Sequence, residues 1–224
     1  MIGCQTKKRL IRFQALSFLL ALWMGTTPLR ADWPEHRGNL QRTGYREQPL
    51  VSKQWVPFWR LDSLSPPQPA WPAPAQGSLW QKLDQIDARV TDDTADVPLI
   101  VLDSQGKSHV LITSSANDRL ISIDPSTGKI RWQYVTRAPI RYAPSISEGI
   151  AYLGADDGLV RAIDIANGTE VWQTRIGPKM PWIIGNDRLI SPHPIRTSVL
   201  VENGQVFATA GLFPSQGVCS FQPG

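Results

Sequence analysis

An internal repeat constrains this chain more than any other feature of its sequence. The segment His109–Trp132 aligns without a gap with the segment Gly149–Trp172, at an offset of 40 residues. A third copy begins at an offset of 55 from the second, where Pro194-Ile195-Arg196 matches Pro139-Ile140-Arg141. The 15 additional residues lie in the Met180–His193 region and form an insertion in the repeat. Self-similarity at a fixed period of this length is the signature of a repeat architecture.

Each repeat contains four short runs rich in Ile, Val and Tyr, which turn-forming residues separate. In the first repeat the predicted strands are Val97–Leu102, Val110–Thr113, Leu120–Ile123 and Ile130–Tyr134. Several runs are apolar on both faces, as in Val110-Leu111-Ile112, and this pattern predicts sheets that are covered on both sides. Four-stranded antiparallel sheets that recur and stack face to face make a β-propeller. A β-sandwich would not explain the repeat.

We therefore predict an all-β chain of propeller blades that follow a leader and an irregular arm. The predicted segments are a signal peptide at 1–31, an arm rich in Trp and Pro at 32–95, and propeller repeats at 96–224, with blades at about 97–136, 137–177 and 194–224 and an insertion at about 178–193. Closed propellers have ~4–8 blades. The third copy stops before the position of its tryptophan, so we expect about three blades of an incomplete ring and an incomplete chain.

The leader also accounts for the basic character of the chain. Its basic residues precede an apolar stretch of about a dozen residues, which is typical of a secretory signal and short for a membrane span. It holds five of the 23 Lys and Arg residues and no acid, so the rest of the chain carries 18 bases against 19 acids. This balance argues against nucleic acid as a partner. We expect a periplasmic or secreted protein with no transmembrane segment after cleavage.

Residues 55–80 of the arm contain four tryptophans interleaved with prolines, at Trp55, Trp59, Trp71 and Trp80. Such a composition favours extended polyproline conformation and not a regular core. The arm is either a strap that docks a partner or a segment that packs its tryptophans on the outside of the propeller. The preference of aromatic side chains for burial favours the second interpretation.

The turn and strand motifs of the repeat resemble those of the pyrroloquinoline-quinone-type propeller repeat. They read Asp124-x-x-x-Gly128-x-x-x-Trp132 in the first copy and Asp164-x-x-x-Gly168-x-x-x-Trp172 in the second. The opening Asp32-Trp33-Pro34-x-x-Arg37-Gly38 also resembles the start of exported bacterial propellers of this group. The resemblance implies that Trp132 and Trp172 dock between blades.

This family comprises quinone-dependent dehydrogenases and non-enzymatic scaffolds. The dehydrogenases need a calcium site, a catalytic Asp and commonly an adjacent Cys-Cys pair, whereas this chain has two separate cysteines, Cys4 and Cys219. The motifs assign no catalytic, cofactor-binding or metal-binding residue, and a pyrroloquinoline quinone cofactor rests on the resemblance alone. Our leading hypothesis is a non-catalytic exported scaffold for a protein or another cell-envelope component. The alternatives are a quinoprotein-like oxidoreductase with its active site in missing blades and a carbohydrate-binding propeller.

The insertion is the best local candidate for a binding site, because loops that depart from a scaffold commonly carry function. Trp182, His193 and Arg196 are candidates to bind an anion or a sugar, or the insertion is a structural flap. Arg141 and Arg196 occupy equivalent repeat positions and are either donors around a central channel or ordinary strand-end arginines. Within the insertion, Asn186–Ser191 duplicates Asn117–Ser122, through chance or as an inserted hairpin.

Overall fold

The computed structural model of the chain describes residues 33, 35–39, 41–45, 56–62, 64–67, 97–185, 188–212 and, for the backbone alone, 218–221. The predicted leader and the arm tryptophans Trp55, Trp71 and Trp80 lie outside these residues. The described residues contain strands, turns and irregular segments and no helix. None of them forms a helix long and apolar enough to cross a membrane.

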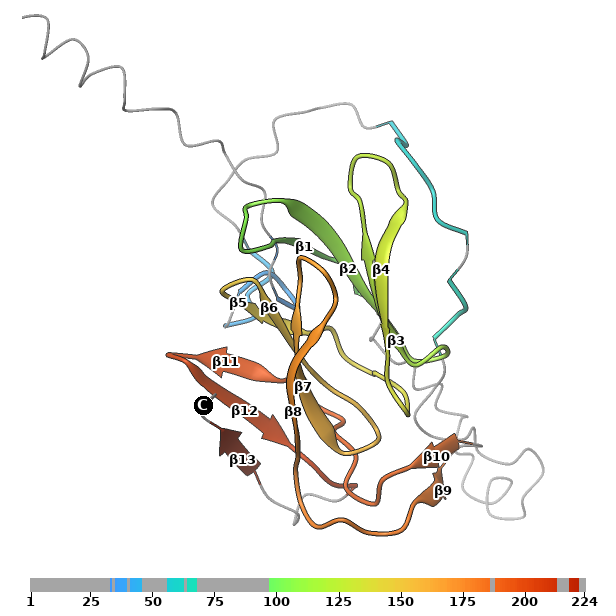
Figure 1. The fold of residues 1–224 in the computed structure, drawn as a ribbon, viewed down its shortest axis with the longest axis vertical. Helices are drawn as coiled ribbons and strands as arrows, with labels where there is room; N and C mark the ends of the chain where they lie inside the picture. The colour runs from blue at the N-terminus through green and yellow to red at the C-terminus, as the bar shows by residue number, and fades with distance from the viewer. Residues whose placement is uncertain are drawn as a thin grey trace, which may run out of the picture. The chain divides into compact units, whose positions relative to one another are not determined.

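In the described part of the chain, thirteen strands form two four-stranded sheets, one three-stranded sheet and one hairpin, all antiparallel (Figure 1). We call the first three sheets blades 1, 2 and 3. Blade 1 consists of β1 (Leu99–Leu102), β2 (Ser108–Ser114), β3 (Arg119–Ile123) and β4 (Ile130–Val135), and blade 2 of β5 (Ser145–Ser147), β6 (Ile150–Gly154), β7 (Leu159–Asp164) and β8 (Glu170–Arg175). The hairpin consists of β9 (Ile183–Gly185) and β10 (Arg188–Ile190), and blade 3 of β11 (Leu200–Glu202), β12 (Gln205–Thr209) and β13 (Val218–Phe221).

The pairing registers of blades 1 and 2 reproduce the sequence repeat. Ser122 pairs with Trp132 in blade 1, and Ala162 pairs with Trp172 in blade 2, each next to a register shift at the following residue. The predicted all-β fold of four-stranded blades is therefore confirmed, and the fold is that of consecutive, unclosed β-propeller blades.

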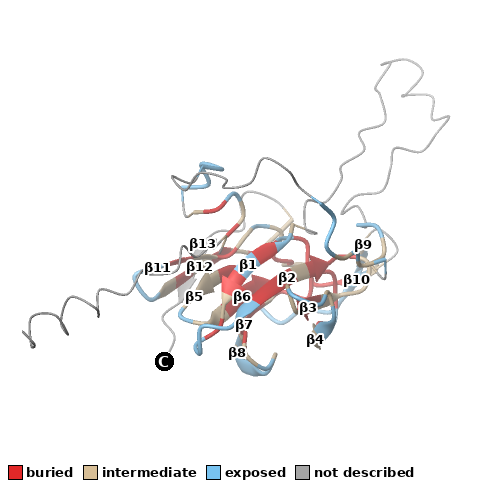
Figure 2. Cartoon of the chain, turned by 90° about the horizontal axis from the view of Figure 1, so that it is seen from above, coloured by how far each residue is buried: buried red, intermediate tan, exposed pale blue. Residues whose placement is uncertain are grey.

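The blades stack face to face through two buried apolar clusters (Figure 2). Leu120 of blade 1 and Leu153 of blade 2 belong to the cluster between the first two blades. Val160 of blade 2 and Val206 of blade 3 belong to the cluster between the second and third. The central strands β3 and β7 are buried along nearly their whole length, as expected for sheets covered on both faces.

The outer face of blade 1 is covered by part of the arm. Trp59, Leu61 and Leu64 pack against the buried side chains of Val110, Ile121 and Ile123. The prediction that the arm packs its tryptophans on the propeller is thus confirmed for Trp59.

A second part of the arm, the described residues between 33 and 41, lies against β1, β5 and β11, the first strands of the three blades. The amide of Trp33 donates a hydrogen bond to the Ile100 carbonyl of β1, at 2.8 Å. A cavity of about 390 Å³ is lined by Gln41 together with Ile146 of β5 and Val201 of β11. The segment therefore lies beside the first strand of each of the three blades.

Candidate functional site on the insertion face

Four connections meet at one end of the blades and form a surface that we call the insertion face. They are the turns at 115–118 and 155–158, the connection 136–144 and the connection 176–199 that contains the insertion. Backbone hydrogen bonds tie them together, since the Asp156 amide donates to the Pro139 carbonyl at 2.9 Å and the Ser191 amide donates to the Asp156 carbonyl at 2.7 Å. The insertion is therefore fixed to the turn of blade 2.

Asp156 is the centre of a buried ion cluster on this face. Its side chain is fully buried and accepts hydrogen bonds from Arg141 Nε at 2.7 Å and from Arg196 Nε and Nη2 at 3.1 Å each. Arg141 is itself 2 % exposed. Two arginines that are equivalent in the repeat thus converge on one carboxylate, so a buried charge is compensated on two sides.

The neighbouring Asp157 binds a different arginine. Its carboxylate faces the guanidinium of Arg161 on β7, with Nη1 at 3.0 Å and Nη2 at 2.5 Å. The Asp157 carbonyl accepts a hydrogen bond from Arg175 Nη1 at 2.9 Å. The adjacent carboxylates of Asp156 and Asp157 are therefore both held by arginines.

The insertion also reaches back to blade 1. Arg188 of β10 forms an ion pair with Asp118 in the β2–β3 turn and donates a hydrogen bond to the Ala116 carbonyl at 3.3 Å. Burial raises the pKa of Asp118 above its ordinary value, although Arg188 opposes this change. The insertion is therefore anchored to the turns of two successive blades.

The duplicated hexapeptide belongs to an inserted hairpin. Gly185 pairs with Arg188 and Ile183 pairs with Ile190 in the β9–β10 hairpin. Arg188-Leu189-Ile190 forms a strand, as does Arg119-Leu120-Ile121 in the original copy. Of the two explanations left open by the sequence, the structure supports the inserted hairpin.

Large apolar side chains are exposed along the insertion. Met180 is 49 %, Trp182 39 %, Ile184 79 % and Leu189 60 % exposed. Exposed apolar side chains that gather on one surface mark sites where another molecule binds. We call these four residues the apolar patch.

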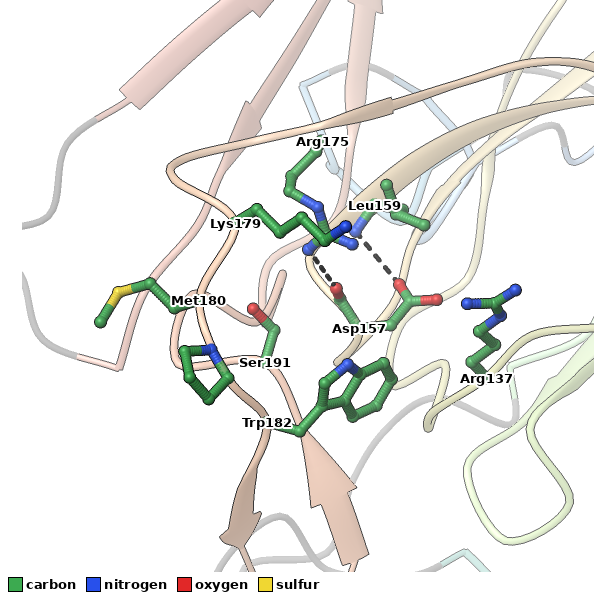
Figure 3. Close-up of a pocket in the computed structure, with 9 residues that line it drawn as sticks. Arg137, Asp157, Leu159, Arg175, Lys179, Met180, Trp182 and Ser191 are labelled. Atoms are coloured by element: carbon green, nitrogen blue, oxygen red, sulfur yellow. Dashed lines mark hydrogen bonds between the residues drawn. The ribbon is translucent and has the colours of Figure 1, made fainter.

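A cavity of about 590 Å³ opens beside the apolar patch (Figure 3). Trp182 and Met180 line it together with the basic residues Arg137, Arg175 and Lys179. Asp157 is the acidic residue in this lining, and Arg161 neutralises it. Arg137 and Lys179 are exposed, so the cavity has a basic and partly aromatic wall.

The four candidate binding residues of the sequence do not form one site. Trp182 lines the cavity, whereas Arg141 and Arg196 are bound to Asp156. His193 packs its ring near Gly177, and its backbone amide donates to Ser191 Oγ at 3.1 Å. The sequence did not identify Arg137, Arg175 and Lys179, because their contribution depends on how the blade connections fold together.

The repeat tryptophans lie at the contacts between layers. Trp132 donates from Nε1 to the Ile165 carbonyl at 2.9 Å, and its ring lies against Gly168. Gly168 follows the turn that Asp164 caps by accepting the Ala166 amide at 2.8 Å. Asp124 accepts the Ser126 amide at 2.8 Å in the equivalent turn of blade 1. Trp172 packs against the cluster between blades 2 and 3, and the centroid of its ring lies 6.0 Å from that of the Tyr152 ring.

Trp59 makes the same contacts with blade 1 that Trp132 makes with blade 2. Its Nε1 donates to the Pro125 carbonyl at 2.7 Å, and its ring lies against Gly128. Pro125 and Gly128 are the repeat equivalents of Ile165 and Gly168. Trp59 was itself the signal in the sequence, but the irregular arm around it hid the equivalence.

Blade 1 also contains an Asp-His-Ser arrangement that the sequence analysis missed. His109 Nδ1 lies 2.8 Å from Ser122 Oγ, and His109 Nε2 lies 3.2 Å from Asp103 Oδ2. All three residues are buried, with His109 and Ser122 at 0 % exposure. Burial lowers the pKa of His109 more than Asp103 raises it. A buried hydroxyl of this kind is out of reach of a substrate, so the arrangement is a structural network.

The comparisons with known proteins point to one family model. The model of outer membrane protein assembly factor BamB matches residues 73–217. The BamB of Yersinia pestis is 27 % identical over 106 residues, which are 45 % of this chain and 26 % of that protein. The chain thus spans about a quarter of the length of this curated relative.

The solved structures that resemble the blades include an alcohol dehydrogenase and a BamB protein. The quinohemoprotein alcohol dehydrogenase from Comamonas testosteroni is 24 % identical, with a TM-score of 0.39, over 51 % of this chain and 17 % of that chain. BamB from Moraxella catarrhalis is 19 % identical, with a TM-score of 0.33, over 58 % of this chain and 48 % of that chain.

Proposed function

We propose that this chain, which belongs to the family of outer membrane protein assembly factor BamB, is a non-catalytic binding scaffold of the cell envelope that holds a protein partner on its insertion face. The observation that carries the proposal is the apolar patch on the β9–β10 hairpin, where Ile184 is 79 % exposed. The name of the family supports an envelope location and a protein partner. The predicted leader is consistent with the same compartment.

The anchoring of the hairpin suits it to binding. Arg188 ties the hairpin to blade 1 through Asp118, and the Ser191 amide ties it to blade 2 through the Asp156 carbonyl. A surface held in place from both ends loses little conformational freedom when a partner binds, so less of the interaction free energy is spent on ordering it. The scaffold thereby presents the apolar side chains in a preformed arrangement.

The charges around the patch define the chemistry of the partner. Arg137 and Lys179 are exposed beside Trp182 at the cavity. We expect a polypeptide whose apolar side chains contact the hairpin and whose acidic side chains face these two cations. The apolar contacts supply most of the affinity, and the cations supply orientation and a faster association.

The described carboxylates do not fit a calcium and quinone site. Among the described residues, no three His, Cys, Asp or Glu side chains gather in one place. Asp156 and Asp157 bind arginine through both carboxylate oxygens, and Asp118 binds Arg188 through Oδ2, so each carboxylate already has a cationic partner in the place of a calcium ion. These carboxylates are therefore arranged for ion pairs with arginine and not for a calcium ion.

A matched pair of substitutions tests the proposal. The full-length protein is used to capture partners from a detergent-solubilised envelope fraction of its source cells. Ile184→Asp places a charge on the apolar patch, whereas Val135→Asp places one on the outer strand β4, where Val135 is 62 % exposed. We expect a discrete partner to be retained by the parent and by Val135→Asp and to be lost with Ile184→Asp. Recovery of the same proteins by both variants would contradict the proposal.

A redox assay separates the scaffold from the oxidoreductase alternative. Pyrroloquinoline quinone and calcium are added to the full-length protein, and dye-linked oxidation of alcohols and sugars is measured. We expect no dye reduction above that of the quinone and calcium alone. Turnover that depends on the protein would favour the quinoprotein-like oxidoreductase.

A further inference from the structure

The dipeptide Asn-Gly occurs twice in the chain, at Asn167-Gly168 and at Asn203-Gly204. Both copies lie in turns between strands, and both asparagines are exposed. An asparagine that precedes a glycine can lose its side-chain ammonia, because the glycine has no side chain to keep its backbone nitrogen away from the asparagine amide carbon. The two copies have different surroundings in the folded protein, so the structure can distinguish their reactivity.

The Asn167-Gly168 copy is held by the turn that contains it. The Asn167 side chain accepts hydrogen bonds from the Thr169 amide at 2.8 Å and from Thr169 Oγ1 at 2.7 Å, and its Nδ2 donates to Asp164 Oδ2 at 3.3 Å. The Gly168 amide donates to the Asp164 carbonyl at 2.8 Å, and a Cβ at residue 168 would lie 2.6 Å from the Trp132 ring. The side-chain amide and the attacking nitrogen are therefore both held by hydrogen bonds.

The Asn203-Gly204 copy is the two-residue turn between β11 and β12 (Figure 1). Glu202 pairs with Gln205 across this turn. The backbone angle φ is 51° at Asn203 and 73° at Gly204, as in the type I′ hairpin turn that favours Asn-Gly. Among the described residues, the Asn203 side chain and the Gly204 amide have no hydrogen-bond partner, and a Cβ at residue 204 would meet no atom within 4 Å. Neither reacting group is therefore held, in contrast to the first copy.

The position of Asn203 is also exposed in a blade that has neighbours on both sides. Its repeat equivalent in blade 2 is Glu148, in the turn between β5 and β6. Glu148 is exposed although blade 3 lies beside blade 2, and it also has a positive φ, of 49°. A Cβ at Gly149 would lie 2.8 Å from the Ser104 amide nitrogen of the preceding blade, whereas Gly204 has no such contact in the described part of the chain. Solvent exposure is thus a property of this turn position.

We propose that Asn203 is a site of spontaneous deamidation and that the fold protects Asn167 from the same reaction. The backbone nitrogen of Gly204 loses its proton and attacks Cγ of Asn203. The new C–N bond replaces the bond from Cγ to Nδ2, and ammonia leaves with the proton. Water then opens the resulting cyclic imide at either of its two carbonyl groups. The products are aspartate and isoaspartate, and no oxidation or reduction takes place.

The reaction changes both the charge and the shape of the β11–β12 turn. Each product carries one more negative charge, next to the exposed Glu202. Isoaspartate also adds a carbon atom to the backbone, which a two-residue type I′ turn cannot accommodate in its present geometry. We therefore expect the pairing of Glu202 with Gln205 to weaken, with faster amide exchange in β11 and β12 of the modified protein.

Peptide mapping by mass spectrometry tests the proposal on the folded, full-length protein. The protein is incubated at mildly alkaline pH, and the fraction of each Asn-Gly peptide that carries an acid in place of the amide is followed over time. An enzyme that methylates isoaspartate identifies that product. We expect Asn203 to react at least about tenfold faster than Asn167, a difference of about 1.4 kcal/mol in activation free energy, because the Asn167 copy must first break its hydrogen bonds.

Two controls separate the effect of the fold from that of the local sequence. In urea, where both turns are unfolded, the two copies are expected to react at similar rates. Asn203→Gly removes the reacting amide but leaves Gly-Gly, which a type I′ turn accepts, so the modification at this turn should disappear. Similar rates in the folded protein, a faster reaction at Asn167, no reaction at Asn203 in the folded protein, or the same difference in urea would overturn the proposal.

Discussion

The arm on blade 1 and blade 1 on blade 2 are two versions of one contact. In each, an indole Nε1 donates to a turn carbonyl, at 2.7 Å for Trp59 and 2.9 Å for Trp132. In each, the indole ring lies against a glycine with positive φ, 69° at Gly128 and 75° at Gly168. A left-handed glycine with no side chain lets the ring approach the turn, which other residues would prevent.

The two contacts differ in what surrounds them. Trp132 belongs to a strand paired with β3, and its interface includes a large buried cluster and a hydrogen bond from the Tyr134 hydroxyl to Glu170. Trp59 belongs to a segment outside any described sheet, and its interface includes Leu61 and Leu64. The same local device therefore holds a structural layer in one place and a separable segment in the other.

Substitution of each tryptophan by alanine is expected to give the largest difference in stability between the two contacts. We expect Trp132→Ala to lower the free energy of unfolding by about 3–4 kcal/mol, because it opens a cavity between two sheets that cannot separate. Trp59→Ala is expected to cost about 1 kcal/mol, because the arm can leave while blade 1 stays folded. Chemical denaturation measures both changes, and limited proteolysis reports cleavage in the arm. Equal losses for the two variants would contradict the distinction.

Substitution of the two glycines that contact the indole rings is expected to give the next largest loss of stability. A Cβ at residue 168 would lie 2.6 Å from Trp132, and a Cβ at residue 128 would lie 2.8 Å from Trp59. Both alanine substitutions carry the left-handed backbone penalty of about 1–2 kcal/mol. Gly168→Ala is expected to cost about 1 kcal/mol more than Gly128→Ala, because Trp132 is held by its sheet and Trp59 can move with the arm.

A double variant isolates the contact in the weaker interface. In the Trp59→Ala background, Gly128→Ala is expected to retain the backbone penalty and to lose any additional cost of displacing the ring. Chemical denaturation of the parent, the two single variants and the double variant gives the coupling free energy between Trp59 and Gly128. If the two substitutions add without coupling, the ring does not bear on Gly128 in solution.

The pH dependence of stability distinguishes blade 1 from blade 2, because Gly149 replaces His109 in the second repeat. Burial lowers the pKa of His109 in the folded protein, so the unfolded chain takes up a proton more readily. The free energy of unfolding is therefore expected to fall as the pH drops below the unfolded value of about 6.5. Asp103 contributes at lower pH, since hydrogen bonds from Lys107, His109 and Gln105 lower its pKa despite its burial.

His109→Gln is the control for this titration. Urea denaturation between pH 7.5 and pH 5 is expected to show a shallower loss of stability in the variant than in the parent. Asp118, whose pKa is raised, titrates in both proteins and cancels in the difference. Parallel curves would show that His109 is not the group responsible.

The blades were predictable because their information is local. The alternation of short apolar runs and the Asp-x-x-x-Gly turns specify strands and hairpins within each 40-residue repeat. The ion cluster on the insertion face was not predictable, because Arg141, Asp156 and Arg196 meet only when connections from two blade junctions fold together. The Trp59 contact is intermediate in predictability. The repeat predicts the turn that Trp59 contacts, but the sequence of the arm does not predict that Trp59 binds there. Contacts between repeats therefore cannot be predicted from the sequence of a single repeat.

Trp59→Phe gives the smallest expected effect and separates the two parts of the arm contact. Phenylalanine keeps an aromatic ring over Gly128 but has no N–H to donate to the Pro125 carbonyl. Because that bond is partly exposed and water can replace it, we expect a cost of at most about 1 kcal/mol. Trp132→Phe should cost more, since the Ile165 carbonyl belongs to a buried residue and an acceptor cut off from water loses its partner outright. Denaturation of the two variants side by side, with amide exchange at the blade 2 turn, therefore tests whether the indole hydrogen bond or the ring contact distinguishes a blade junction from an attached arm.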